Sequence, residues 1–155
     1  MSVRKALGLG AISGLRSASG PAFVSQAANR GVLELDGTRL AFLGSPRVSK
    51  ALLLMALGEF VGDKLPMAPG RTTLPPLLVR AASGGLVGAA LFVAEGRRAV
   101  TGAALGAPTS VAAAFAGEGL RVFVGRKTGV PNLFVALAED AVVVLVGSSS
   151  LRNGR

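Results

Sequence analysis

Five apolar stretches, separated by proline, glycine and charged residues, constrain the fold of this chain more than any other feature. Each is close to the ~20 residues that a helix needs to cross a hydrocarbon core about 30 Å thick. We therefore predict an all-α fold, an integral membrane bundle of about five transmembrane helices in one domain over residues 1–155. The stretches cover approximately residues 5–27, 48–65, 77–95, 99–125 and 132–150.

The composition is typical of helices that face lipid. Hydrophobic residues make up 50% of the chain and charged residues only 16%, whereas soluble domains carry about 25% charged residues. Glycine occurs 22 times, and small residues let membrane helices approach each other closely. His and Cys are absent, so the commonest general base and any thiolate metal site are excluded.

The connections between the stretches are short, except for a polar loop at about residues 28–47. Short connections favour antiparallel packing of neighbouring helices. We expect Pro108 to kink the fourth helix, because proline removes a backbone hydrogen bond. A signal peptide is the alternative for residues 1–27, which begin with Arg4 and Lys5, but Arg16 interrupts the apolar run.

Five crossings would place the two termini on opposite sides of the membrane. By the positive-inside rule, the distribution of Lys and Arg slightly favours an N-terminus outside, and dual insertion is the alternative. With a net charge of +9, scattered basic residues fit anionic lipid headgroups better than nucleic acid. The two sides would hold Arg4, Lys5, Lys64, Arg71, Arg126 and Lys127 against Arg30, Arg39, Arg47, Lys50, Arg97, Arg98, Arg152 and Arg155.

The second apolar stretch ends in a charged run that contains Glu59, Asp63 and Lys64. A charge at the bilayer centre costs from about 3 to above 10 kcal/mol, so membrane proteins keep one only with a partner or a use. Glu59 and Asp63 are spaced i, i+4 and share one helix face. Two carboxylates suit a hard cation such as Ca²⁺, Mg²⁺ or Mn²⁺, or a proton relay. If a metal binds, these two residues are the candidate ligands.

Two short patterns occur twice in the chain. Gly14-Leu15-Arg16 recurs at 119–121, and Ala56-Leu57-Gly58-Glu59 recurs at 136–139 with alanine in place of glycine. With one helix between them, the two pairs would form inverted two-helix repeats around a central helix, an arrangement typical of transporters. Short matches in a chain rich in Ala, Gly and Leu also arise by chance.

If the repeat is real, buried charges would pair across it. Arg16 would pair with Glu59, and Arg121 with Glu139. Glu59, Asp63, Glu139 and Asp140 are then the candidate transport or ion-binding residues, with Arg16, Arg121 and Lys64 as internal counter-ions.

These motifs together resemble a family of bacterial membrane proteins, domain of unknown function 4126. The resemblance rests on Gly-Leu-Arg in the first helix, on Glu59, Asp63, Lys64 and Pro66, and on Arg121, Asn132 and Ala138-Glu139-Asp140. It covers nearly the whole chain and implies a small multi-helix integral membrane protein, with no established activity. The Glu59–Lys64 run also resembles, by analogy only, the Glu-x-Gly-Asp-Lys motif of Gdt-type cation/proton exchangers.

Three functional hypotheses follow. The first is a transporter or exchanger in the bacterial cell membrane, multi-pass, that moves a cation or proton past the buried carboxylates; a homodimer is one form it could take. The second is a non-catalytic membrane protein that organises lipids or partner proteins, with the charges as structural pins. The third, an enzyme acting on lipid phosphate, ranks last because no nucleophile motif is present. We expect no enzyme activity, no cofactor and membrane lipids as partners.

Overall fold

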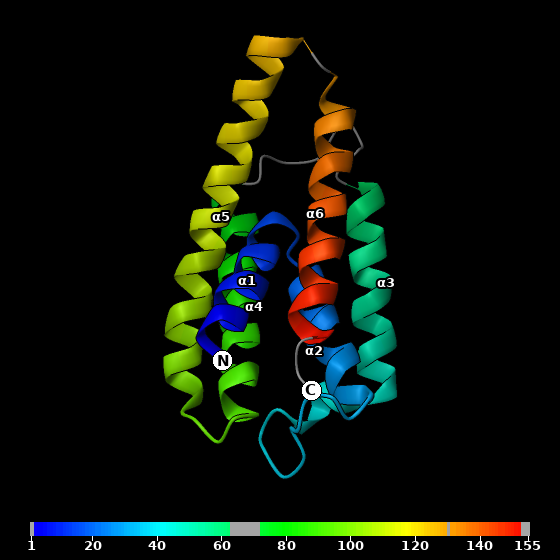
Figure 1. Cartoon of the computed structure of the whole chain (residues 1–155), viewed down its shortest axis with the longest axis vertical. Coiled ribbons are helices and arrows are strands. Elements are labelled where there is room, and N and C mark those ends of the chain that lie inside the picture. Colours follow the sequence, from blue (N-terminus) through cyan, green and yellow to red (C-terminus); the bar gives the residue numbers. More distant parts are fainter. Residues whose placement is uncertain (1, 63–71, 130, 153–155) are drawn as a thin grey trace.

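Helices account for all of the regular secondary structure in the residues that the computed structural model describes, which are 2–62, 72–129 and 131–152 (Figure 1). The all-α prediction is therefore confirmed for these residues. In chain order the elements are α1 (Ser2–Leu15), α2 (Ser19–Asn29), the short 3₁₀ helix η1 (Ala41–Gly44), α3 (Pro46–Gly62), α4 (Leu74–Val93), α5 (Ala99–Thr128) and α6 (Asn132–Arg152).

The single helix predicted over residues 5–27 is wrong, because α1 and α2 are two short helices that form a hairpin. Pro21 explains the position of the break. In a continuous helix its ring would clash with the carbonyl group of Ser17, whereas in the first turn of α2 its missing N–H leaves no bond unmade. The backbone of Gly20 packs directly against that of Leu9, because a Cβ on Gly20 would lie 3.0 Å from the carbonyl oxygen of Leu9. The chain therefore turns back on itself after α1.

This hairpin lies inside the bundle formed by the other four helices. α1 packs against α4, α5 and α6, and α2 packs against α3, α4 and α6. The hairpin enters from the lower end of the bundle, and its tip, residues 16–18, reaches about halfway up (Figure 1). α1 therefore begins at the same end of the bundle at which α6 ends, and not at the opposite end as five crossings would require (Figure 1).

The other four helices lie close to their predicted ranges. α4 begins three residues earlier than predicted, because Pro75 and Pro76 lie in its first turn, where proline is tolerated. α5 continues through Pro108 as one helix and ends at Thr128, and the φ of +63° at the following Gly129 is the left-handed conformation common after helix ends. The structure assigns no break at Pro108.

Glycines bring α1, α4 and α5 into backbone contact. Each of these helices carries a pair of glycines spaced i, i+4: Gly10 and Gly14, Gly84 and Gly88, Gly102 and Gly106. A Cβ on Gly84 would lie 2.5 Å from the carbonyl oxygen of Gly106, and one on Gly10 would lie 3.2 Å from that same oxygen. Spacing of small residues by four is how membrane helices approach most closely, and the glycines of these three helices have this packing role.

The surface of the bundle is apolar, and its interior holds charges. Arg16 is fully buried, and Arg80 and Glu139 are 4% and 8% exposed. Large apolar side chains are exposed along α3, α4, α5 and α6, and two of these helices, α4 and α5, are long and apolar enough to cross a membrane by length and composition. Among the exposed side chains are Leu54, Met55, Val61, Leu78, Val79, Val100, Phe115, Phe123, Phe134, Val144 and Leu145.

Candidate functional site

The carboxylate of Glu59 holds the start of α2. Its Oε1 accepts hydrogen bonds from the backbone N–H of Ser17 at 2.8 Å and from the Ser17 hydroxyl at 2.9 Å, and its Oε2 accepts one from the N–H of Ala18 at 2.8 Å. The first N–H groups of a helix have no partner within the helix and carry a partial positive charge. The carboxylate of Glu59 therefore accepts hydrogen bonds from backbone N–H groups in the turn between α1 and α2.

Arg80 of α4 binds the other side of the break. Its Nη1 donates to the carbonyl oxygens of Gly14 at 2.6 Å and Leu15 at 2.9 Å, which are at the end of α1. The last carbonyl groups of a helix attract cations for the same reason that its first N–H groups attract anions. The Nη2 of Arg80 also lies 3.9 Å from Oε1 of Glu59, so the two capping side chains attract each other.

Arg16, at the tip itself, forms its ion pair with Asp140 of α6. Its Nε lies 3.0 Å from Oδ1 of Asp140, and its Nη2 donates to the same oxygen. Glu59 is the partner expected from the sequence. The Nη1 of Arg16 donates a hydrogen bond to the backbone carbonyl oxygen of Glu59 at 3.5 Å. The guanidinium also lies over the ring of Phe60, 5.2 Å from its centroid, so a cation–π contact joins the tip to α3.

A second ion pair joins α5 to α6. The Nη2 of Arg121 lies 2.6 Å from Oε2 of Glu139, which is the contact expected from the sequence. Glu139 is 8% exposed. Because Glu139 and Asp140 are consecutive, the two ion pairs of α6 are neighbours in the chain.

The expected carboxylate pair of Glu59 and Asp63 lies partly outside the described residues. Asp63 and Lys64 are not described, and neither is Pro66. In the part of the chain that the structure describes, no group of three or more Asp or Glu residues is placed to hold a metal ion. The carboxylates of Glu59, Glu139 and Asp140 accept hydrogen bonds from guanidinium and N–H groups, and such donors disfavour a bare cation.

Sequence reasoning missed Arg80 and Ser17 in this site. Arg80 is a single charge within the third apolar stretch, and the cost of burying such a charge could have marked it as a partner for the hairpin. Its position is fixed by α5, where the hydroxyl of Ser110 donates to the Arg80 carbonyl oxygen at 2.7 Å. Ser17 gave no signal of its own, because its role depends on the break before Pro21.

The inverted repeat expected from the sequence stays a prediction. The first half of the repeat contains the hairpin of α1 and α2, followed by α3. In the second half, α5 is one continuous helix that includes Arg121. The two Gly-Leu-Arg motifs therefore lie in different local structures, although both arginines form ion pairs with α6.

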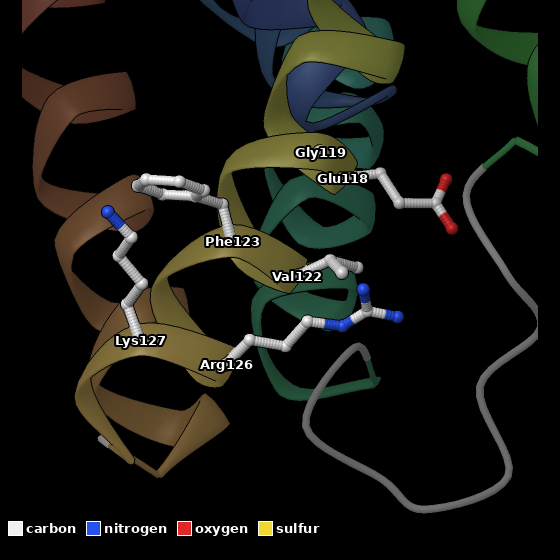
Figure 2. Close-up of a pocket in the computed structure, with 6 residues that line it drawn as sticks. All are labelled: Glu118, Gly119, Val122, Phe123, Arg126 and Lys127. Atoms are coloured by element: carbon white, nitrogen blue, oxygen red, sulfur yellow. The ribbon is translucent and has the colours of Figure 1, made fainter.

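A pocket of about 510 Å³ lies further along α5. Figure 2 shows that its residues all belong to this helix, with Phe123 and Lys127 on one side and Glu118 and Arg126 on the other. The ammonium of Lys127 lies 5.0 Å from the centroid of the Phe123 ring. All of its lining residues come from one helix, whereas side chains of three helices meet at the hairpin tip, so we assign the candidate site to the tip.

Comparison with known families supports the resemblance seen in the sequence. The family described as Domain of unknown function (DUF4126) matches residues 4–152. The match includes the hairpin, the capping residues and both ion pairs. No curated protein and no solved structure matches the chain. The chain therefore belongs to the family Domain of unknown function (DUF4126).

Proposed function

We propose that this protein is a multi-pass integral membrane protein of the bacterial cell membrane, with α3, α4, α5 and α6 as spans. The support is the distribution of polarity, with exposed apolar side chains on all four helices and charges inside. α4 and α5 have the length and hydropathy of membrane spans. α3 and α6 have 17 and 21 residues, within the range of about 17–25 for a span.

In this proposal the hairpin of α1 and α2 enters the membrane without crossing it. With 14 and 11 residues, and a rise of 1.5 Å per residue, the helices are about 21 and 16 Å long. Neither reaches across a core of about 30 Å. Irregular backbone at membrane depth is tolerated where protein encloses it and satisfies its polar groups, and Glu59 and Arg80 satisfy the groups at this break.

We further propose that the protein is a small transporter, with the hairpin tip as its site. The observation that carries this proposal is the turn between α1 and α2. Charged side chains of other helices bind the end of α1 and the start of α2 there. Discontinuous helices near the bilayer midplane form the substrate and ion sites of many secondary transporters. This is an analogy of architecture.

A proton suits this site better than a metal cation. A hard metal cation needs several free oxygen ligands, whereas a proton needs one, and the carboxylates of Glu59, Glu139 and Asp140 already accept hydrogen bonds from this chain. A proton that binds the carboxylate of Asp140 would neutralise it and weaken its hold on Arg16. When the proton leaves, the ion pair would form again. Alternation between the two forms can couple proton movement to a change at the hairpin tip.

A flux measurement tests the transporter proposal. Purified protein in liposomes that contain a pH-sensitive dye is exposed to Mn²⁺, Ca²⁺, Na⁺ and K⁺ in turn, and then to a pH gradient alone. We expect proton movement by the native protein, its loss in Asp140→Asn, and partial activity in Asp140→Glu, which keeps a titratable group. Asp36→Asn, in the exposed loop, is the matched control and should behave as the native protein.

Glu59→Gln is a poorer test of transport, because Glu59 also accepts the hydrogen bonds that hold the hairpin. One of its oxygens would become an amide nitrogen that faces N–H groups of the hairpin. Size-exclusion chromatography of each variant separates a loss of flux from a loss of fold. A well-folded native protein that moves neither protons nor these cations would contradict the transporter proposal.

The second candidate function is a non-catalytic membrane protein, in which the charges fix the hairpin and partners or lipids are organised around the bundle. The observation that favours it is that Glu59, Glu139 and Asp140 already accept hydrogen bonds from this chain. It predicts that exchanging the charges of Arg121 and Glu139 keeps the fold and that no proton or cation flux occurs. Flux in the native protein that the exchange abolishes would exclude it.

A further inference from the structure

Basic residues gather at one end of the bundle. Within the described residues, nine Lys and Arg residues belong to the lower end, where α1 and α3 begin, where α2 and α6 end, and where α4 is connected to α5 (Figure 1). At the upper end Arg126 and Lys127 are described, near the end of α5. The other three described arginines, Arg16, Arg80 and Arg121, form contacts between helices and are not counted for either end. The nine are Arg4, Lys5, Arg30, Arg39, Arg47, Lys50, Arg97, Arg98 and Arg152.

The hairpin is the reason for this asymmetry. With one crossing helix over residues 5–27, Arg4 and Lys5 would be opposite the loop at residues 30–45, and the two sides would be nearly balanced. Because α1 and α2 turn back, Arg4 and Lys5 join that loop at the lower end. Lys64 and Arg71 fall between α3 and α4 in the sequence, and even with both added to the upper end the excess at the lower end remains.

We infer that the lower end of the bundle faces the cytoplasm and contacts anionic lipid headgroups. This inference rests on the membrane placement proposed above and does not depend on transport. Cytoplasmic segments of membrane proteins carry the excess of Lys and Arg, and acidic residues contribute little to this rule. Glu34, Asp36 and Glu95 at the lower end therefore do not reverse the assignment.

The side chains at this end also fit the headgroup region of a bilayer. Exposed apolar residues alternate with the basic ones: Val32 is 55% exposed, Phe42 51% and Val100 78%. The guanidinium of Arg97 lies 4.2 Å from the centroid of the Phe92 ring. A surface of mixed basic and apolar side chains contacts both phosphate groups and the first acyl carbons, and the anionic lipids of the cytoplasmic leaflet attract basic segments close to the membrane.

Single cysteines test the orientation without background, because the native chain contains no Cys. Glu95→Cys places a thiol in the exposed connection between α4 and α5, and Lys127→Cys places one on an exposed position of α5 at the other end. Intact bacterial cells are treated with a membrane-impermeant maleimide before and after permeabilisation. We expect Lys127→Cys to react in intact cells and Glu95→Cys to react only after permeabilisation.

The opposite pattern, or labelling of both variants in intact cells, would overturn the assignment, as would protection of Lys127→Cys until permeabilisation. Labelling of the denatured proteins confirms that each thiol is reactive. Extraction of membranes with alkaline carbonate separates this result from a failure of the membrane proposal. Protein that the carbonate releases is not integral, whereas retained protein with reversed labelling contradicts only the orientation.

Lipid selectivity tests the second part of the inference. Thermal unfolding of purified protein is measured in mixed micelles with phosphatidylglycerol or with phosphatidylcholine, at low and high salt. We expect phosphatidylglycerol to raise the unfolding temperature, and salt to reduce the effect. The variant Arg39→Gln/Arg47→Gln/Lys50→Gln should lose most of the effect, and Arg126→Gln/Lys127→Gln, the control, should keep it. Equal unfolding temperatures in the two lipids would contradict a headgroup contact.

Discussion

At the residue scale, three side chains from separate helices stabilise the irregular tip of the hairpin. Glu59 binds the N–H groups at the start of α2, Arg80 binds the carbonyl groups at the end of α1, and Asp140 binds Arg16 between them. Each charge has a group of opposite charge or polarity in contact. Hydrogen bonds to charged groups contribute about 1.5–3 kcal/mol each, so these contacts affect stability independently of any function of the protein.

We predict that Glu59→Gln lowers the free energy of unfolding by about 1–3 kcal/mol, because one N–H group of the hairpin loses its acceptor. The measurement is thermal or denaturant unfolding in detergent, followed by circular dichroism of the helices. Glu34→Gln removes an exposed carboxylate from the loop and should change the stability by less than about 0.5 kcal/mol. Equal stability of the two variants would contradict the capping role of Glu59.

The ion pair of Arg121 and Glu139 gives a second prediction. Removal of one partner, as in Glu139→Gln, leaves a guanidinium without its charge partner and should cost about 3 kcal/mol, near the lower end of the range for buried pairs, because Arg121 is 18% exposed. The exchange variant Arg121→Glu/Glu139→Arg should recover part of this loss. A double-mutant cycle on the free energy of unfolding measures the coupling, and additive single effects would show that the pair does not couple.

At the element scale, backbone contact between α4 and α5 sets how closely these two helices pack. A Cβ on Gly106 would overlap the carbonyl oxygen of Gly84, and one on Gly102 would overlap that of Gly88. Because the obstacle is backbone, a side-chain rotation cannot relieve it. The same surface of α5 receives α1 through Gly10, so the position of the hairpin depends on these glycines.

We predict that Gly106→Ala lowers the free energy of unfolding by about 1–3 kcal/mol, as overpacking of a well-packed interior does. Gly125→Ala is a matched control in the same helix, because nothing lies within 4 Å of a Cβ at that position. Alanine is the better helix former by about 1 kcal/mol, so this control should keep or raise the stability. A neutral Gly106→Ala would show that α4 and α5 can separate without cost.

The outer surface is the property of the whole molecule that most favours a membrane environment. Leu145 is 67% exposed near the middle of α6. In water, lysine at such a position would be nearly neutral, whereas in lipid it costs at least about 2.5–3.5 kcal/mol. We predict that Leu145→Lys sharply reduces the amount of folded protein in the membrane fraction, measured by immunoblotting after carbonate extraction. Asp36→Lys, in the exposed loop, is the control and should leave that amount unchanged.

Much of the architecture could be predicted from the sequence, because hydrophobic length and proline position act locally. The ranges of α3, α4, α5 and α6 agree with the apolar stretches to within a few residues. The ion pair of Arg121 with Glu139 was also accessible, because a buried charge requires a partner and few were available. The role of Arg80 was not predicted, because its acceptors are backbone carbonyl groups that exist only where α1 ends.

The sequence by itself determined the helical class, the family motifs and the set of charges that must be paired inside the bundle. Only the tertiary structure decided which groups Arg16, Glu59 and Arg80 bind and where the first apolar stretch turns. A turn of the chain depends on whether distant side chains can satisfy the backbone groups that it exposes, and Glu59 and Arg80 are 41 or more residues from the groups that they bind. That turn also places the beginning of α1 and the end of α6 at the same end of the bundle, because one additional reversal of direction changes the end at which the chain begins.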